Sequence, residues 1–427
     1  SAGKWRGVDA TGNADAGNGS GGVVLVGGAN LNTIGGTTAA DRNVVSGNTD
    51  EGISLDGATN TLVIGNYVGV GADGVTIIGN DGDGVALQFG ATGNTVGGTT
   101  AAARNLIAGN AGPGIGGVAN GRIKDAGTTG NVVLGNYIGV DATGGFALAS
   151  PREGVRIEGG ATNNTIGGAA AGAGNVISGH AGHGILLDDA DGNTIQRNLI
   201  GTNAAGNSVV GTDAQPLGNR LEGIHLRNGS SSNVIGGVGL GNVIASNPVI
   251  GGSTTWGGIW IRDAGSDNNA VQGNWIGTNG AGDVLGLGYN GVELTDGASY
   301  NLIGGANAGE GNVIAYAQDD GIFVYDNGGH STGNAFLRNS IYGNDVEANG
   351  DGIGIDLEDT PNVGVYNVTP NDGGDGDGGM GFPNEHQNYP VLTAATTGSG
   401  QVNVTWSLDS VAGATFRVAF FSSPPAS

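Results

Sequence analysis

A four-residue phrase, Gly-Ile/Val-x-Leu, recurs along most of this chain at intervals of roughly 30 to 40 residues. Clear copies begin at Gly22, Gly52, Gly84, Gly154, Gly184, Gly223, Gly258, Gly291 and Gly321, and looser copies begin at Gly114 and Gly352. Such a period is typical of a solenoid, in which each repeat buries its apolar side only by stacking on its neighbours. The repeat therefore limits the possible folds more than any other feature of the sequence.

Two further apolar segments lie between successive copies. One reads Asn-Thr-Ile-Gly-Gly, as at Asn32 and Asn164, and the other reads Asn-Val-Ile-x-Gly or Asn-Tyr-Ile-Gly, as at Asn175 and Asn136. All three segments alternate with period two and are bounded by glycine, which predicts short strands joined by turns. We therefore predict an all-β fold, a right-handed parallel β-helix over residues 1–360. It is a three-sided solenoid of about eleven coils, roughly 50 Å long.

Asparagine recurs at two fixed places in every coil. One set precedes the second strand, and includes Asn32, Asn60 and Asn94; the other precedes the third strand, and includes Asn105 and Asn136. A stacked asparagine can hydrogen-bond its amide to the asparagine of the next coil and tolerates a left-handed turn. We therefore predict that these asparagines are structural and are not ligands.

The composition excludes several classes of protein. The chain has 427 residues, 93 glycines, no cysteine and a formal net charge of −24. The glycines lack the three-residue period of collagen, and no apolar run approaches the length of a membrane span. The negative charge disfavours nucleic acid, which needs a basic surface, so we expect no nucleic-acid partner and no membrane insertion. The absence of cysteine fits an exported bacterial protein.

The repeated phrases resemble those of the bacterial right-handed parallel β-helix repeat proteins, the pectate-lyase-like superfamily in the broad sense. They are similar to repeats of very large secreted or surface-anchored proteins. The resemblance implies a secreted or cell-surface location and a larger parent protein, but it does not specify an activity. Fragments such as Gly182-His183-Gly184 and Arg122-Ile123-Lys124 match the polygalacturonase pattern in the wrong order, so we do not assign the chain to that family.

Stacking the first strand of each coil predicts three columns of outward side chains. The column at the x position begins with Val24, Ser54, Ala86 and Gly116 and continues with Arg156, Leu186, His225, Trp260, Glu293 and Phe323. The column two residues further along contains Glu158, Asp188, Arg227, Arg262, Thr295, Tyr325 and Asp356. The column before the glycine contains Glu153, His183, Glu222, Asn290, Asp320 and Asp351.

These columns resemble the sugar-binding face of β-helix polysaccharide enzymes, where aromatic rings stack on sugars and arginines bind acidic groups. The candidate catalytic residues are His225, Arg227, Arg262, Glu293 and Tyr325, and the candidate substrate-binding residues are Arg156, Asp188, Glu222, Trp260 and Phe323. His225 as a base, with the two arginines and Tyr325 as an acid, would suit β-elimination on a uronan. Asp188, Glu222 and Glu293 would instead suit a hydrolase.

Arg227 and Arg262 are expected on adjacent coils, about 4.8 Å apart. That spacing is unfavourable unless an anion or a carboxylate such as Glu222 or Glu293 lies between them. No cluster of Cys and His with metal-ligand spacing is evident in the sequence.

Beyond the repeats the composition changes. Residues 361–388 are predicted as a Gly/Asp-rich linker, and residues 389–427 as a β-strand tail or a truncated β-sandwich module. Asp372, Asp375 and Asp377, with glycines between them, resemble a calcium loop, so calcium is a possible cofactor; a charged linker is the alternative.

Two functions remain open from the sequence. One is a protein that engages extracellular polysaccharide through an outer-sheet groove, with or without cleaving an acidic glycan by elimination or hydrolysis. The other is a non-enzymatic surface or adhesin stalk in which the solenoid is a rigid spacer.

Overall fold

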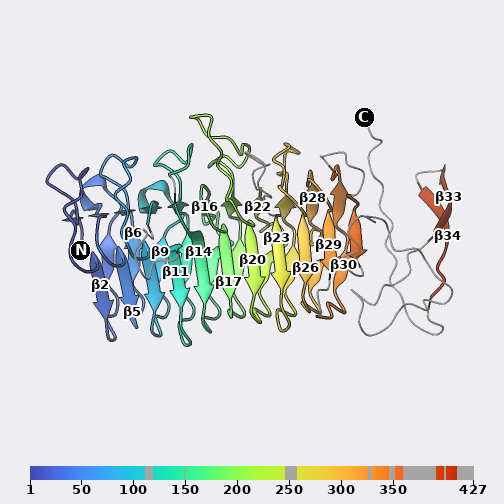
Figure 1. Cartoon of the computed structure of the whole chain (residues 1–427), viewed down its shortest axis with the longest axis horizontal. Coiled ribbons are helices and arrows are strands. Elements are labelled where there is room, and N and C mark those ends of the chain that lie inside the picture. Colours follow the sequence, from blue (N-terminus) through green and yellow to red (C-terminus); the bar gives the residue numbers. More distant parts are fainter. Residues whose placement is uncertain are drawn as a thin grey trace.

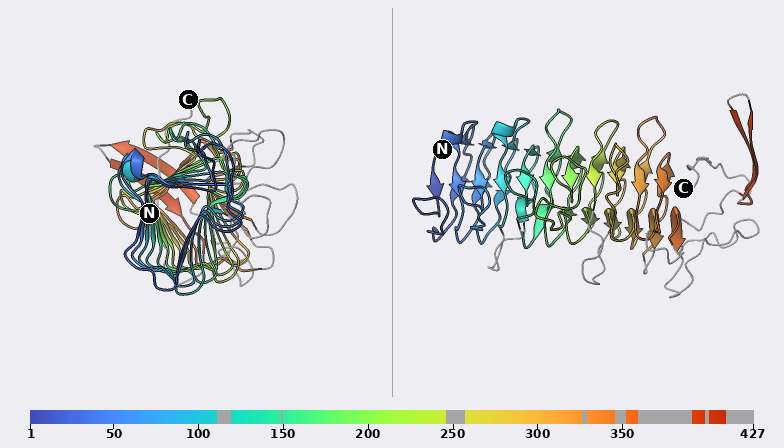
Figure 2. Two further views of the ribbon diagram at one scale, coloured as in Figure 1. Left: turned by 90° about the vertical axis from the view of Figure 1, so that its left-hand side faces the viewer. Right: turned by 90° about the horizontal axis from the view of Figure 1, so that it is seen from above.

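The computed structural model describes residues 1–110, 119–148, 150–245, 257–325, 329–345, 352–358, 391–398 and 401–410. Its strands stand side by side along a rod (Figure 1) and form three parallel sheets of eleven, ten and eleven strands. Seen along the rod, the strands of successive coils superpose around a shared interior (Figure 2). The predicted three-sided parallel β-helix is confirmed.

Each coil contributes one strand to each sheet. The first sheet contains β2 (Val23–Val26), β5 (Ile53–Asp56), β8 (Val85–Gln88), β11 (Ala119–Lys124), β14 (Glu153–Glu158), β17 (Ile185–Asp188), β20 (Ile224–Arg227), β23 (Ile259–Arg262), β26 (Val292–Thr295), β29 (Ile322–Tyr325) and β32 (Ile355–Glu358). The second sheet contains β3 (Thr33–Gly35), β6 (Leu62–Ile64), β9 (Thr95–Gly97), β12 (Val132–Leu134), β15 (Thr165–Gly167), β18 (Thr194–Gln196), β21 (Val234–Gly236), β24 (Ala270–Gln272), β27 (Leu302–Gly304) and β30 (Ala335–Leu337).

The third sheet completes the coils. It contains β1 (Trp5–Arg6), β4 (Val44–Val45), β7 (Tyr67–Val68), β10 (Leu106–Ile107), β13 (Tyr137–Ile138), β16 (Val176–Ile177), β19 (Leu199–Ile200), β22 (Val243–Ile244), β25 (Trp275–Ile276), β28 (Val313–Ala315) and β31 (Ser340–Tyr342). Two short 3₁₀ turns, η1 (Ala39–Asp41) and η2 (Ala101–Ala103), lie in loops. Within the described ranges no helix has the length and apolar character needed to span a membrane.

One continuous apolar core runs the length of the rod. The inward residues of the first sheet, such as Ile185 and Leu187, are fully buried and pack with inward residues of the other two sheets, such as Ile195 and Ile200. Because side chains alternate across a strand, the residues between them point outward. The core thereby fixes which side chains form the outer columns.

Buried asparagines join successive coils into ladders, as predicted. In the ladder before the third sheet, Asn136 Nδ2 donates to Val96 O (2.9 Å) and to Asn175 Oδ1 (3.1 Å), and Asn136 Oδ1 accepts from Asn105 Nδ2 (3.0 Å). The ladder before the second sheet has the same form, with Asn94 Nδ2 donating to Asn131 Oδ1 (2.9 Å). These side chains satisfy turn backbone that would otherwise be buried without a partner.

Asn60, however, was assigned wrongly. Thr61 occupies the ladder position of its coil, where its backbone N–H donates to Asn94 Oδ1 (2.9 Å), while Asn60 sits beside it in a left-handed turn with φ of 49°. A third ladder at the remaining corner was not predicted. It includes Asn80 and Asn110, joined at 2.7 Å, and continues through His180, whose Nδ1 lies 2.9 Å from Asn219 Oδ1. Burial lowers the pKa of His180 to about 4, so its role here is structural.

Two loose copies of the repeat were placed wrongly. The coil after β8 supplies β11, in which Arg122 pairs with Ala86 and Arg156, so Arg122 takes the column position expected for Gly116; residues 111–118 lie outside the described ranges. In the last coil Asp356 pairs with Phe323 and not with Tyr325, so the copy begins at Gly354. In the last coil the run Gly352-Ile353-Gly354-Ile355 offered two possible registers, whereas in β11 the position paired with Val85 is Gly121, so the repeated phrase does not mark that strand.

The last described segment is an antiparallel hairpin of β33 (Val391–Gly398) and β34 (Gln401–Ser407). It agrees with two of the strand-like segments expected in the tail. The predicted linker and the calcium-loop candidates Asp372, Asp375 and Asp377 lie outside the described residues, so the calcium site and the domain boundaries stay predictions.

We predict that Asn136→Ala lowers the free energy of unfolding by about 2–4 kcal/mol, because it leaves several buried donors and acceptors without partners. Denaturant unfolding followed by circular dichroism measures the change. Asn207→Ala, on an exposed loop, is the matched control and should cost no more than about 0.5 kcal/mol. Equal effects of the two substitutions would show that the ladder is not a major source of stability.

Candidate functional site

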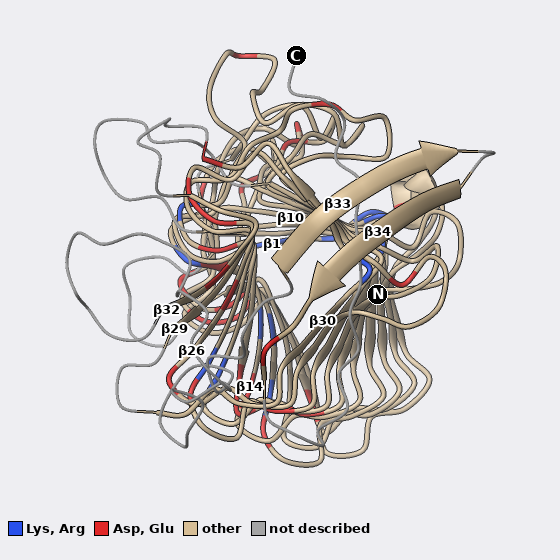
Figure 3. Cartoon of the chain, turned by 90° about the vertical axis from the view of Figure 1, so that its right-hand side faces the viewer, with Lys and Arg blue, Asp and Glu red and all other residues tan. Residues whose placement is uncertain are grey.

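Charged residues of the strands are concentrated on the first sheet. Among the described strands, the second sheet contains no Asp, Glu, Lys, Arg or His, and the third sheet contains only Arg6. Those of the first sheet include Asp56, Arg122, Lys124, Glu153, Arg156, Glu158, Asp188, His225, Arg227, Arg262, Glu293 and Asp356. Figure 3 shows blue and red segments around β14 and β26, whereas the sheet that contains β30 is tan. The outer face of the first sheet is therefore the candidate site.

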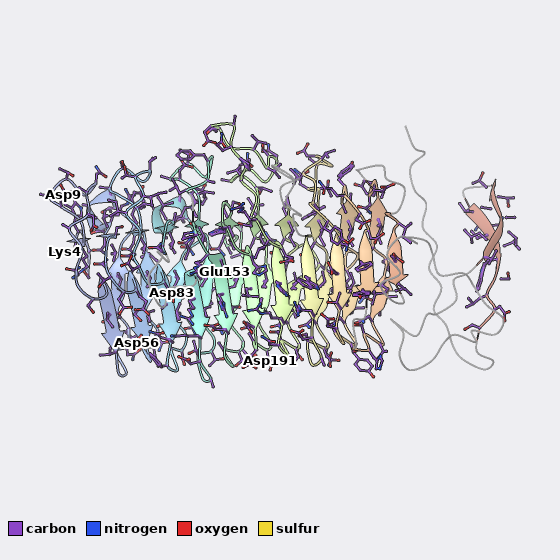
Figure 4. All side chains as sticks on the ribbon, in the orientation of Figure 1. Lys4, Asp9, Asp56, Asp83, Glu153 and Asp191 are labelled. Carbon is purple, nitrogen blue, oxygen red and sulfur yellow. The ribbon has the colours of Figure 1, made fainter. Side chains whose placement is uncertain are left out.

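A chain of ion pairs crosses the coils in the middle of this face, from β8 to β20. Its members, in order of contact, are Asp83, Arg122, Glu158, Arg156, Asp188 and Arg227. Arg156 Nη2 and Arg227 Nη2 lie 3.0 Å and 2.8 Å from Asp188 Oδ2. Burial opposes ionisation of Asp188, but hydrogen bonds from Arg227 and Asn228 outweigh it and lower the pKa of this carboxyl. Figure 4 labels Asp83 and also Glu153, which lies at the start of β14.

A hollow of about 380 Å³ lies beside these ion pairs. Its walls are formed by Arg122, Lys124, Asp125, Glu158, Gly159, Asp188 and Asp189. The lining contains both signs of charge, which suits a polar ligand with many hydroxyl groups.

Arg227 and Arg262 do lie on adjacent strands, but neither Glu222 nor Glu293 forms an ion pair between them. Arg227 turns to Asp188 on the preceding coil, whereas Arg262 Nε lies 3.1 Å from Asp263 Oδ1 and 3.9 Å from Asp296 Oδ2. The two guanidinium groups are thus neutralised by different carboxylates. The arginines predicted to bind an acidic glycan are already paired within the protein.

A buried cluster of His183, Glu222 and His225 lies next to the ion pairs. Glu222 and His225 are each 2% exposed and His183 is 7% exposed. Glu222 Oε2 lies 2.7 Å from His183 Nδ1 and 3.8 Å from His225 Nδ1, and the two imidazoles approach to 3.5 Å between His225 Nδ1 and His183 Nε2. His183 and Glu222 lie side by side because each precedes the glycine of its repeat in adjacent coils, where Gly184 N–H donates to Glu222 O.

The cluster is poorly satisfied by hydrogen bonds. His183 Nδ1, Glu222 Oε2 and His225 Nε2 are buried atoms without a hydrogen-bond partner among the described residues, although His183 Nδ1 and Glu222 Oε2 lie only 2.7 Å apart. Burial, followed by the charges of His183, Arg227 and Arg262, lowers the pKa of His225 to about 2. His225 is therefore neutral over the physiological range.

Trp260 and Glu293 extend the cluster over the next two coils. The indole of Trp260 stacks on His225 with ring centres 4.6 Å apart and an angle of 16°, and its Nε1 donates to Thr295 Oγ1 (2.9 Å). Arg262 lies 4.8 Å from the ring centre. Trp260 is thus held by protein contacts and offers less open ring surface than expected for a sugar platform.

Glu293 pairs in register with Trp260 on one side and Phe323 on the other. Burial, together with the negative charge of Glu222, raises the pKa of Glu293 to about 8. The carboxyl therefore remains largely protonated near neutral pH, although part of the side chain reaches solvent. A partly exposed, protonated carboxyl is a candidate proton donor.

The remaining predicted residues lie further along the same face. Phe323 and Tyr325 form an aromatic pair with ring centres 6.0 Å apart and an angle of 16°, and both are partly exposed. Tyr325 is three coils from His225, which corresponds to about 14 Å between their strands. Those two side chains cannot act together on one bond in this arrangement.

Sequence reasoning missed Arg122 and did not include His183 in the candidate site. Arg122 was hidden by the misplaced repeat copy. His183 stood in the correct column, but only the coil register shows that its imidazole meets Glu222 and His225 from the next strand. The sequence signal that could have revealed the cluster is that its residues occupy outward positions in successive coils.

Comparison with known proteins adds little to this description. A scan against protein-family models found no match, and neither did a search of curated proteins. Among solved structures, a mutant of the periplasmic alginate epimerase AlgG is similar with a TM-score of 0.42 and 13% sequence identity. The similarity covers 72% of this chain and 64% of that chain. We draw no conclusion about activity from a match this distant.

We predict that the stability of the chain falls as pH rises from 4.5 to 8, in part because of Glu293. Its folded pKa is raised, so the folded chain binds more protons than the unfolded chain in this interval, and the free energy of unfolding decreases with pH. Screening of the partly exposed carboxyl limits the effect to on the order of 2–4 kcal/mol.

Glu293→Gln isolates this contribution. Denaturant unfolding at several pH values should show a smaller decrease for the variant than for the parent chain, because a glutamine does not titrate. Parallel pH profiles for the two chains would contradict the raised pKa.

Proposed function

We propose that this chain is a secreted or cell-surface protein that binds polysaccharide along the outer face of the first sheet and hydrolyses it. The concentration of charged residues on that one sheet carries the proposal. The scaffold does not require them: Leu186 pairs in register with His225 in the same outer column and is itself buried. A polar cluster that the fold can replace with leucine is more consistent with function than with packing.

The face offers two kinds of contact for a glycan. Phe323 and Tyr325 present partly exposed, nearly parallel rings, which suit the apolar faces of sugar rings. The hollow beside Glu158 and Asp188 offers charged groups for hydroxyls. A linear polymer lying along the rod would meet both, because they belong to the same sheet.

Two glutamates support hydrolysis. Glu293 supplies a proton to the leaving oxygen of the glycosidic bond, and Glu222, on the other side of Trp260, accepts a proton from the attacking water. Glu222 lies three residues before His225, which is in register with Glu293 two coils away, and the charge of Glu222 acts on Glu293. The two residues are therefore candidates for the carboxyl pair of a glycosidase. The bond to the leaving oxygen breaks as the bond from water to the sugar carbon forms.

Elimination on an acidic glycan is less well supported. His225 has no candidate acid within reach, because Tyr325 is three coils away. Arg227 and Arg262 are neutralised by Asp188 and by Asp263, so a uronate would have to displace a protein carboxylate. We therefore expect cleavage of neutral chains in preference to acidic ones.

The alternative is a non-enzymatic stalk. It is favoured by the asparagine ladders that join the coils and by the internal pairing of the arginines, which leave a regular rod. The stalk reading predicts no cleavage of any glycan and no effect of Glu293 beyond stability.

The test is a screen of neutral and acidic polysaccharides that follows both new reducing ends and the absorbance of unsaturated products. We expect reducing ends alone. Glu293→Gln should lower the rate by about 10²–10⁴-fold, the usual contribution of general acid catalysis. Thr194→Ala, an outward residue of the second sheet, is the matched control and should leave the rate unchanged.

Binding is tested separately with Phe323→Ala. Loss of one aromatic contact should weaken binding of the cleaved glycan by about 0.5–1.5 kcal/mol, measured by calorimetry with the Glu293→Gln chain as background. Unsaturated products would replace hydrolysis with elimination, and a panel with neither binding nor cleavage would leave the stalk as the better account.

A further inference from the structure

We propose that His183, Glu222 and His225 bind one divalent transition-metal ion of the zinc class. Each residue offers one ligand atom, and the three atoms lie within 4.8 Å of one another. They come from two adjacent coils of the first sheet, so the rigid stacking of β17 on β20 holds them together. Two imidazoles and one carboxylate are a common protein ligand set for zinc.

The unsatisfied atoms of the cluster point to a missing partner. Eight buried side-chain atoms lack a hydrogen-bond partner among the described residues, and three of them belong to this cluster. Buried polar groups normally find a partner, because leaving them unpaired costs stability. An ion beside His183 Nδ1 and Glu222 Oε2 would satisfy two of these three atoms, and His225 would coordinate it through Nδ1.

The geometry needs only small side-chain movements. Bonds of about 2.0–2.2 Å in a tetrahedral site place ligand atoms about 3.3 Å apart. Glu222 Oε2 lies 2.7 Å from His183 Nδ1 and 3.8 Å from His225 Nδ1, on either side of that value. The imidazoles meet edge to face at 70°, with ring centres 4.8 Å apart, so both can present a nitrogen to one point.

The ligand types select the metal class. Calcium and magnesium prefer six or more oxygen ligands, whereas imidazole nitrogen favours zinc and its first-row neighbours. Three protein ligands leave a fourth position for water, as in catalytic zinc sites. With an ion bound, Glu222 is a ligand and no longer the base, and the ion would activate the attacking water in its place in the proposed hydrolysis.

The competing explanation is a proton shared between His183 and Glu222, which would make the cluster an internal ion pair. It predicts no metal affinity. Metal binding itself does not depend on the proposed glycan activity, so the two proposals can fail separately.

The experiment uses the whole chain, freed of metal with a chelator, and titrates it with Zn²⁺ by calorimetry in competition with a chromophoric chelator. We expect one ion per chain, and a tetrahedral visible spectrum when Co²⁺ replaces Zn²⁺. Glu222→Gln and His183→Ala should each weaken affinity at least 10-fold. His330→Ala removes an exposed histidine outside the cluster and should change neither stoichiometry nor affinity.

Circular dichroism and the melting temperature without metal establish that each variant is folded. The nearly isosteric Glu222→Gln keeps the test valid if His183→Ala does not fold. The proposal is overturned if the parent chain binds no Zn²⁺, or if folded Glu222→Gln binds it as tightly as the parent.

Discussion

The buried side-chain hydrogen bonds at the corners of the coils are the constraint on which the whole structure depends. A solenoid turns three times per coil, and each turn leaves backbone N–H and C=O groups that neither sheet can pair. Asn136 shows the solution: its amide bonds the carbonyl of one coil and the asparagine of the next. Glycine completes the corner, as at Gly97, where φ is 94° and a Cβ would lie 2.0 Å from Leu134 O.

Because the ladders fix the register of successive coils, they also fix which side chains lie on the outer faces of the sheets. Outward residues of adjacent coils become neighbours at a spacing set by the backbone. A substitution at one outward position therefore changes one side chain of a column and leaves the others in place. The first sheet uses this to assemble ion pairs and then a buried His–Glu–His cluster, while the second sheet carries uncharged residues at equivalent positions. The coils form the scaffold, and one face carries nearly all the charged residues of the described strands of the three sheets.

The sequence was sufficient for the fold, since period-two alternation and the spacing of glycine and asparagine reflect local rules. The sequence also predicted the columns of outward side chains correctly wherever the repeated Gly-Ile/Val-x-Leu phrase was intact, as at His225, Trp260 and Glu293. It failed at Arg122 and Asn60, where the register depends on which residue enters the core or the ladder. It also missed the meeting of His183 with Glu222, because side-chain direction within a column is set by packing against the neighbouring coil.

The central claim is that the outer face of the first sheet is the functional surface of the molecule. Hydrogen–deuterium exchange in the presence of each polysaccharide of a panel tests it most directly, because it locates a ligand without requiring turnover. The account predicts that at least one glycan slows exchange in segments 153–158, 183–188, 222–227, 257–263, 290–296 and 322–325 and leaves the strands of the second sheet unchanged. Protection confined to the second or third sheet, or no protection with any glycan, would contradict it.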